Sequence, residues 1–352
     1  MIKVLIVDDS AFMRSALSKM LSSDPAISII GTARDGEEAV EKVSQLKPDI
    51  VTMDVEMPRM DGISALKAIM ERNPVPIIMM SSLTTEGARV TLDALDAGAV
   101  DFIPKELSNL SVNIFKVREM LIHKVKSISR VAVRSIRESK RSLTTKKLLQ
   151  APSTSLTRTT GERRIGIVSI GTSTGGPKAL QEIIPQIPDD FPVPIVIVQH
   201  MPPNFTRPFA ERLNSLSRVT VKEAEEGDSL RPGLVVIAPG RGHMRVMKRR
   251  GIETVITISE NREDFIYRPS VDALMLSVAE LFPGRALGVI LTGMGNDGMK
   301  GLMALKKGGG RVFAQNEETC VVYGMPKAVV EAGIADKVLP IEEMAGEIVN
   351  AV

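Results

Sequence analysis

The chain has 352 residues, 43% hydrophobic and 25% charged, a composition typical of a globular protein with about two domains. Its single cysteine excludes a disulfide framework, and no uncharged segment approaches the ~18 residues of a membrane span. The net charge is +3, yet nine Phe, two Tyr and no Trp are too few for an aromatic nucleic-acid platform. The N-terminus is apolar for only a few residues, which argues against a signal peptide. We therefore expect a cytoplasmic protein with no nucleic-acid partner and no membrane insertion.

Strand-like and helix-like segments alternate through the first part of the chain. Apolar runs of buried-strand length lie at residues 3–7, 27–31, 50–53, 75–80 and 100–104. The segments between them have helical periodicity and turn residues at their ends. Five strands that alternate with helices predict an open, parallel, flavodoxin-like (βα)5 domain.

Polar residues follow four of these predicted strands: Asp8 and Asp9, then Asp54, then Ser81, then Lys105. Ligands of doubly wound sheets bind beyond the carboxyl ends of the strands, so these side chains should converge. Three carboxylates in one crevice repel one another, and a divalent cation such as Mg²⁺ would relieve that repulsion. A carboxylate beside the metal could then attack a phosphoryl group, with the lysine and the hydroxyl contacting its oxygens.

Residues 1–122 resemble the receiver domain of two-component response regulators. The matching segments are Val4-Leu-Ile-Val-Asp-Asp-Ser10, Met53-Asp-Val-Glu-Met-Pro58, Met60-Asp-Gly62, Met80-Ser-Ser82 and Gly98-Ala-Val-Asp-Phe102, which leads to Lys105. The resemblance implies that Asp54 is the phosphoacceptor. It makes Asp9 and Asp54 metal ligands, together with the backbone carbonyl of Glu56, and gives Asp8 a supporting role.

The resemblance also implies that Ser81 follows the phosphoryl group and that Lys105 pairs with it. One departure from the family pattern is visible at this lysine. The family usually has proline after it, whereas here Glu106 follows and Pro104 precedes. This difference affects the backbone turn expected at Lys105 but not the assignment of the lysine itself.

The positive charge is concentrated in the middle of the chain. Residues 116–164 contain 14 basic and 3 acidic residues, whereas residues 1–115 have a net charge of −6 and residues 165–352 of −2. Apolar positions continue at helical spacing from residue 110 to residue 128, so the fifth helix should extend into this basic part. Residues 142–162 are rich in Ser, Thr, Lys and Arg and indicate a solvated linker, with docking to an acidic partner or to nucleic acid as the alternative. We place the receiver at 1–122, a basic linker at 123–163 and a second domain at 164–352.

The second domain again combines strands and helices. Buried strands are expected at residues 164–170, 193–198, 234–237, 254–258, 287–291 and 311–314. Helical segments between several of them predict a second doubly wound, mainly parallel α/β sheet.

A nucleophile motif follows the first strand of this domain. The segment Gly171-Thr-Ser-Thr-Gly175 satisfies G-x-S-x-G between a predicted strand and a helix that begins near Pro177. Small neighbours permit the tight turn that exposes the hydroxyl of Ser173. The alternative is a glycine-rich loop that binds an anion at the helix N-terminus or simply turns the chain.

A serine nucleophile needs a base, and the chain has three histidines. His123 lies on the extended helix and is expected at the surface. His200 directly follows a strand, as Ser173 does, so it is the better candidate for the base. His243 follows another strand through a loop and remains an alternative base or a residue on the substrate side. The three positions are too dispersed for a metal site.

The acid that orients the imidazole should also follow a strand. Asp297 follows the strand at 287–291 in a glycine-rich loop, although an Asp-Gly turn would explain it as well. The order Ser, His, Asp differs from that of α/β-hydrolases, subtilisin and chymotrypsin, which argues against those families. Cys320 has acidic neighbours that disfavour a thiolate, so we expect an inert, packed thiol.

Residues 164–352 resemble the catalytic domain of the chemotaxis protein-glutamate methylesterases. The matching segments are Gly171-Thr-Ser-Thr-Gly-Gly-Pro177, Gln199-His-Met-Pro202, Ala238-Pro-Gly240, His243-Met244, Arg268-Pro-Ser-Val-Asp272, Leu291-Thr-Gly-Met-Gly-Asn-Asp-Gly298 and Tyr323-Gly-Met-Pro326. The resemblance makes Ser173 the nucleophile, His200 the base and Asp297 its orienting acid. It assigns the oxyanion contact to the backbone N–H of Met294 and a supporting role to Thr174.

Together these features predict an esterase that phosphorylation activates. Its substrates would be glutamate methyl esters, and certain glutamines, of chemoreceptors, and a chemotaxis histidine kinase would be the phosphodonor. Mg²⁺ is expected in the receiver and no cofactor at the esterase site. The alternatives are a hydrolase of another acyl ester or amide, a response regulator that binds DNA, and a catalytically silent receptor adapter.

Overall fold

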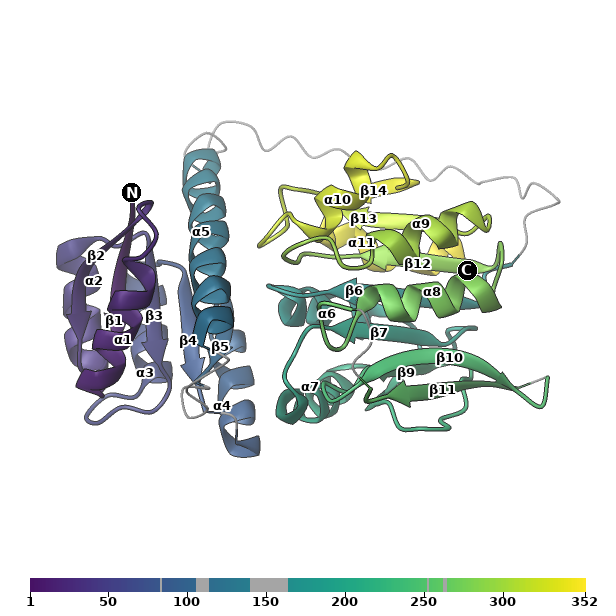
Figure 1. Cartoon of the computed structure of the whole chain (residues 1–352), viewed down its shortest axis with the longest axis horizontal. Coiled ribbons are helices and arrows are strands. Elements are labelled where there is room, and N and C mark those ends of the chain that lie inside the picture. The colour runs from purple at the N-terminus through teal and green to yellow at the C-terminus, as the bar shows by residue number, and fades with distance from the viewer. Residues whose placement is uncertain (83, 106–113, 140–163, 252, 262–264) are drawn as a thin grey trace.

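The structure is a computed structural model that describes residues 1–82, 84–105, 114–139, 164–251, 253–261 and 265–352. These residues form two α/β domains that lie side by side (Figure 1). Both domains contain a parallel sheet with helices on its two faces, so the predicted fold class is confirmed.

The first domain is a five-stranded parallel sheet in the order β2-β1-β3-β4-β5. Its strands are β1 (Ile2–Val7), β2 (Ile27–Ala33), β3 (Ile50–Asp54), β4 (Ile77–Ser81) and β5 (Asp101–Pro104). Its helices are α1 (Ala11–Leu21), α2 (Gly36–Leu46), α3 (Gly62–Arg72), α4 (Thr85–Asp96) and α5 (Ile114–Ser139). Aspartates cap two of them, since the side chain of Asp35 accepts the amide of Glu38 and that of Asp61 accepts the amide of Ser64. The five predicted strands all match observed strands to within two residues at their starts.

Helix α5 extends the first domain past its predicted end at residue 122. Val125 and Ile128 are buried in the same apolar cluster as β1, α1 and Leu121. Two lysines of the predicted linker are also paired within this domain: Lys124 Nζ lies 2.5 Å from Asp101, and Lys126 Nζ lies 2.8 Å from Asp24. The proposed linker at 123–163 is therefore wrong at its start, because residues 123–139 are helical. Its later part, 140–163, lies outside the described residues.

The second domain has a seven-stranded, fully parallel sheet in the order β14-β13-β12-β6-β7-β9-β8. The strands are β6 (Ile167–Thr172), β7 (Ile195–Gln199), β8 (Thr220–Glu223), β9 (Leu234–Ile237), β12 (Ala286–Ile290), β13 (Arg311–Gln315) and β14 (Lys337–Leu339). Strand β6 lies in the middle of the sheet. Strands β7, β9 and β8 lie on one side of it, and the later strands β12, β13 and β14 lie on the other. The topological switch point therefore lies between β6 and β12, where ligands of such sheets bind.

The remaining strands form a two-stranded antiparallel hairpin, β10 (His243–Arg249) and β11 (Glu253–Ser259). The segment at 254–258 that we expected as a strand thus belongs to this hairpin and not to the main sheet. The helices are α6 (Gly176–Ile183), a short 3-10 turn η2 (Ile184–Gln186), α7 (Pro203–Leu216), α8 (Val271–Leu281), α9 (Met299–Lys307), α10 (Met325–Glu331) and α11 (Ile341–Ala351).

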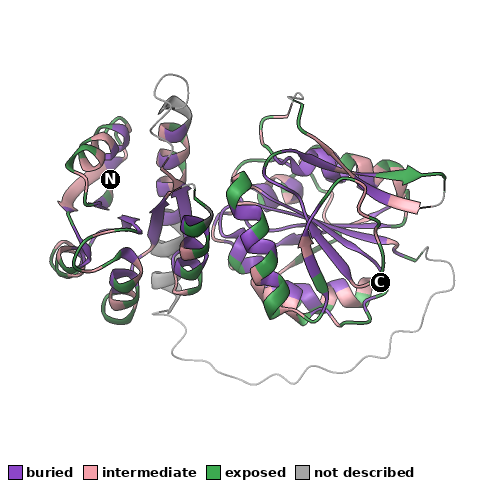
Figure 2. Cartoon of the chain, turned by 90° about the horizontal axis from the view of Figure 1, so that it is seen from below, coloured by how far each residue is buried: buried purple, intermediate pink, exposed green. Residues whose placement is uncertain are grey.

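Burial is concentrated in the two sheets and in the inner faces of the helices around them (Figure 2). The strands at the centres of the sheets, such as β3, β6 and β7, are buried along their whole length, as expected for strands covered on both faces. In the part of the chain that the structure describes, no helix combines the length and apolar character required to cross a membrane.

Candidate active site and phosphorylation site

The hydroxyl-bearing residue Ser173 lies in the turn between β6 and α6. Its amide donates to the carbonyl of Thr292 (3.0 Å), and its carbonyl accepts from the amide of Gly176 (2.9 Å). Gly175 has φ +77°, and a Cβ at Gly176 would lie 2.1 Å from the side-chain oxygen of Gln199. The two glycines are therefore required for a turn of this shape, which presents Ser173 at the carboxyl end of the sheet.

His200 follows β7, the neighbour of β6 in the sheet. Its Nε2 lies 2.7 Å from Oδ2 of Asp297, which is on the loop after β12. Its Nδ1 is buried and has no hydrogen-bond partner in the structure, so it is the ring nitrogen left for a proton from another group. Three strand ends thus bring the predicted serine, histidine and aspartate to the switch point of the sheet.

Asp297 is held by the start of α8 as well as by the histidine. The hydroxyl of Ser270 donates to Oδ1 (3.0 Å), as does the amide of Asp272 (3.0 Å), and the amide of Val271 donates to Oδ2 (2.7 Å). Burial on its own would raise the pKa of Asp297. The hydrogen bond and charge of His200 and these backbone donors outweigh it and hold the pKa below its usual value. The carboxylate is therefore ionised and fixed in orientation.

The loop that carries Met294 packs directly against the serine. A Cβ at Gly293 would lie 2.9 Å from the Cβ of Ser173, so this position has no room for a side chain. The hydroxyl of Thr292 donates to the carbonyl of Thr174 (2.9 Å), which joins this loop to the serine turn. Met294 is the next residue after this close approach, and Thr174 is buried beside the serine.

The receiver side chains also converge at the ends of their strands. Ligand oxygens of Asp8, Asp9 and Asp54 all lie within 4.8 Å of one another. Nζ of Lys105 lies 2.9 Å from Asp8 and 2.5 Å from Asp54. Burial raises the pKa of Asp54 to about 6, against the opposing effect of Lys105, and the charge of Asp8 adds to the increase. Three oxygen donors that repel one another fit a hard divalent cation.

Two other predicted receiver residues occupy different positions. Glu56 is exposed, and its amide lies 3.4 Å from Oδ1 of Asp54, so its backbone is adjacent to the carboxylate cluster. The hydroxyl of Ser81 lies 2.5 Å from the hydroxyl of Thr91 and 3.3 Å from the carbonyl of Gly87, both on α4. In this state Ser81 is thus bonded to α4. Glu106, the departure from the family pattern, lies outside the described residues.

Comparison with known proteins gives the same division of the chain. Residues 168–348 match the family model "CheB methylesterase", and residues 4–112 match "Response regulator receiver domain". The chain belongs to the CheB methylesterase family. It is 50% identical, over the full length of both chains, to "Protein-glutamate methylesterase/protein-glutamine glutaminase 1" of Oleidesulfovibrio alaskensis.

Other members of the family are nearly as similar. A "Protein-glutamate methylesterase/protein-glutamine glutaminase" of Pyrococcus horikoshii is 46% identical over 100% of this chain and 94% of its own. Among solved structures, the "Thermotoga maritima CheB methylesterase catalytic domain" is 46% identical, with a TM-score of 0.52, and covers 54% of this chain and 100% of that one.

The other candidate residues have different surroundings. His243 begins β10, is buried, and packs against the ring of Phe265 at 5.3 Å, whereas His200 is the histidine that contacts Asp297. His123 is exposed on α5 and within 3.2 Å of the hydroxyl of Ser127. Cys320 is buried. Burial is the main cause that raises the pKa of its thiol, and the charges of nearby acidic residues add to the increase, which fits an inert residue.

Sequence reasoning missed several residues that support the site in this member of the family. The side-chain amide of Gln199 donates to the carbonyls of both Ser173 (2.9 Å) and His200 (3.0 Å). Tyr267 stacks on the ring of His200 with a centroid distance of 4.5 Å. Both residues lie in or directly beside the matching segments quoted above, and that proximity was the only signal that could have identified them.

Proposed function

We propose that the chain is a protein-glutamate methylesterase and protein-glutamine glutaminase of chemoreceptors, which phosphorylation of its receiver activates. The observation that carries the esterase assignment is the arrangement of Ser173, His200 and Asp297 at the switch point of the second sheet. Full-length relatives that carry both activities in their names support the choice of substrate. A hydrolase of another acyl ester or amide is not favoured, because those relatives cover the whole chain.

In the proposed reaction, Ser173 Oγ attacks the γ-carbonyl carbon of a glutamate methyl ester, and Nδ1 of His200 takes its proton. Asp297, bonded to Nε2, holds the ring tautomer and stabilises the cation that forms. The backbone N–H of Met294 donates to the oxyanion, with Thr174 in support. The proton then passes to the departing methanol, and water hydrolyses the acyl-enzyme by the same route in reverse. Deamidation of glutamine uses the same steps with ammonia as the leaving group.

In the receiver, Asp54 accepts a phosphoryl group from a histidine kinase of the chemotaxis system. Asp9 and Asp54, with the carbonyl of Glu56, would hold Mg²⁺, and Asp8 and Lys105 lie beside them. A bound Mg²⁺ supplies neutralisation of the negative charge on the phosphoryl oxygens. Ser81 would leave its contacts with α4 to bond the phosphoryl group. We place these reactions in the cytoplasm, and the single buried thiol fits that compartment.

The receiver lies over the esterase site in this state. A cavity of about 250 Å³ contains Ser173 and His200 on one wall. The opposite wall consists of receiver residues, among them Phe102, Met120 and Lys124 from β5 and α5. A receptor helix would have to displace these side chains to reach the serine, which supports the proposal that the unphosphorylated protein is the inhibited form.

Polar contacts join the two domains between α4 and α6–α7. Arg212 of α7 pairs with both Asp93 (2.8 Å) and Asp96 of α4. The side-chain amide of Gln181 on α6 donates to Asp96 (3.0 Å). These groups are partly exposed, so each pair contributes little, on the order of 0.2–1 kcal/mol.

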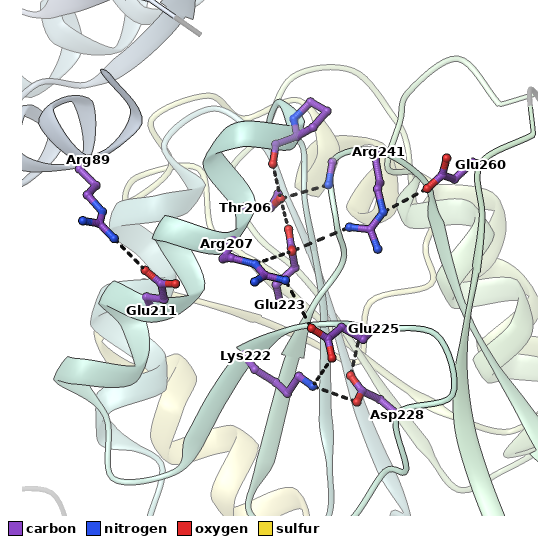
Figure 3. A network of polar contacts seen from close by, with 12 residues as sticks. Arg89, Thr206, Arg207, Glu211, Lys222, Glu223, Glu225, Asp228, Arg241 and Glu260 are labelled. Atoms are coloured by element: carbon purple, nitrogen blue, oxygen red, sulfur yellow. Dashed lines mark hydrogen bonds and ion pairs between the residues drawn. The ribbon is translucent and has the colours of Figure 1, made fainter. Parts of the chain in front are cut away.

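The catalytic side of this contact is itself anchored to the sheet. Figure 3 shows Arg89 of α4 reaching Glu211 of α7 at 3.6 Å. On the inner side of α7 the hydroxyl of Thr206 donates to the buried carboxylate of Glu223 on β8 (2.5 Å), and Arg207 lies 3.4 Å from the same carboxylate. These bonds hold α7 on its own sheet, so the catalytic side of the contact is anchored independently of α4.

Two measurements test the proposal. Methanol release from a methylated receptor should disappear in Ser173→Ala, and release at the wild-type rate by this variant would reject the esterase assignment. Acetyl phosphate with Mg²⁺ should stimulate the wild type and leave Asp54→Asn at its basal rate. Stimulation that survives in Asp54→Asn would reject activation through this aspartate.

A further inference from the structure

The base His200 is held at one edge by Asp297 and over one face by an aromatic ring. The planes of His200 and Tyr267 are 11° apart, with centroids separated by 4.5 Å, the geometry of an offset stack. Tyr267 is half-buried in the segment that precedes α8, and the same segment continues into the residues that bond Asp297.

The hydrogen bond to Asp297 does not by itself fix the plane of the imidazole. A histidine ring turns easily about its second side-chain torsion, because that torsion has a broad energy profile. Such a turn keeps the ring near the carboxylate but moves Nδ1, the nitrogen that must face Ser173. A flat ring stacked on one face opposes this rotation.

Tyr267 also contacts the loop that leads to Asp297. A Cβ at Gly295 would lie 2.7 Å from the hydroxyl oxygen of Tyr267, and Gly295 has φ +83°. This loop carries Met294, whose amide faces the oxyanion in the proposed reaction. One side chain therefore packs against both the base and the loop of the oxyanion contact.

We infer that Tyr267 is a positioning residue of the esterase, whose ring stack keeps Nδ1 of His200 directed at Ser173. This inference rests on the proposed function, since it concerns the same reaction. The planar ring, which stacks on His200, provides the effect on the base, and the hydroxyl near Gly295 is not part of it. Misplacing a reacting group by about 1 Å can cost ~100-fold in rate, so a loss of this size marks the upper end of the expected effect.

The test measures kcat and KM of the full-length protein, activated with acetyl phosphate and Mg²⁺, on a receptor peptide that carries a glutamate γ-methyl ester. Tyr267→Ala should lower kcat by about 10- to 100-fold and leave KM within about two-fold. Tyr267→Phe keeps the flat ring and should retain kcat within about three-fold. Tyr267→Leu keeps apolar volume without a flat ring, so it should resemble the alanine variant. Ile266→Ala is the matched control, because the neighbouring Ile266 is 92% exposed.

The outcomes separate the inference from the function on which it rests. Wild-type kcat in the Ala and Leu variants would overturn the inference, provided that Ser173→Ala is inactive. Equal losses of kcat in Tyr267→Phe and Tyr267→Ala would overturn the inference and assign the effect to the hydroxyl. A change in KM alone would also overturn it, because it would indicate that Tyr267 contacts the substrate. If Tyr267→Ala melts at a lower temperature than the wild type, the comparison of Tyr267→Leu with Tyr267→Phe replaces it. A lower kcat in the Leu variant than in the Phe variant then supports the inference, and equal kcat values overturn it. If the wild type itself releases no methanol through Ser173, the proposed function fails first.

Discussion

The aromatic contact between the two domains yields the sharpest prediction. Phe102 of β5 and Phe205 of α7 stack with centroids 4.6 Å apart and planes 14° apart. They are 5% and 0% exposed, although they belong to different domains. Removing the ring of Phe102 should therefore weaken the closed state and increase the basal activity of the unphosphorylated protein.

The size of the effect follows from the contact. An aromatic stack contributes about 0.5–1.5 kcal/mol beyond burial. Full burial of such a side chain contributes about 1.5–3 kcal/mol, and roughly half of that belongs to the face that meets the other domain. The sum is about 2 kcal/mol, or a shift of roughly 30-fold in the equilibrium between closed and open forms.

The assay compares methanol release by wild type and Phe102→Ala with and without acetyl phosphate. The basal rate should rise by about 30-fold, or as far as the phosphorylated rate if that limit is reached first. The phosphorylated rate should change little, since Phe102 is free of the contact in the open form. Phe12→Ala is the control, because Phe12 is 68% exposed on α1 of the same domain. A basal rate that stays at the wild-type level would refute the view that this contact closes the site.

Three further predictions concern charge and reactivity. Arg212→Ala should raise the basal rate by about five-fold, and 0.5 M NaCl should raise the basal rate of the wild type more than that of the variant, which of the described ion pairs between the domains keeps only Arg89–Glu211; a salt effect of equal size in both would contradict the role of the Arg212 ion pairs. Protons should compete with Mg²⁺ at Asp54, whose raised pKa is about 6, so calorimetry should find Mg²⁺ bound about ten-fold more weakly at pH 5 than at pH 7.5. An affinity that does not change with pH would count against that assignment. Cys320 should react with a disulfide reagent at pH 8 at least about 100-fold more slowly in the native protein than in denaturant, and rapid native labelling would show that the thiol is accessible.

The residues at the strand ends could be located from the sequence because they depend on local pattern and one rule of topology. Asp54, Ser173 and His200 each follow a buried apolar run, and parallel strands bring such positions to a common edge. The starts of the five receiver strands were predictable for the same reason.

The elements that sequence reasoning missed lack an apolar run. Strand β10 contains Arg245, Lys248 and Arg249, and it pairs with β11 in a hairpin outside the main sheet. Strands β8 and β14 lie at the two edges of the main sheet and have four and three residues. The linker was placed directly after the receiver resemblance, which ends at residue 122, whereas Lys124 and Lys126 lie on the extended fifth helix and are paired with acids of the first domain.

Contacts between distant segments that the strand-end rule does not relate could not be predicted. Tyr267 and His200 are both in connections between elements, where no periodicity relates them. Phe102 and Phe205 belong to different domains, and each alone reads as an ordinary core residue. Geometry was needed to pair them, and both pairs bear on how the site is arranged.

The contact between the domains combines one aromatic stack, apolar packing of Val321 and Val322 against the receiver core, and several partly exposed ion pairs. Two separate proteins held by such a contact would part on sufficient dilution. In a single chain each domain meets the other at an effective concentration on the order of millimolar. The contact can therefore stay closed even if its intrinsic affinity is low. The unphosphorylated protein should therefore be equally inhibited at nanomolar and micromolar concentrations.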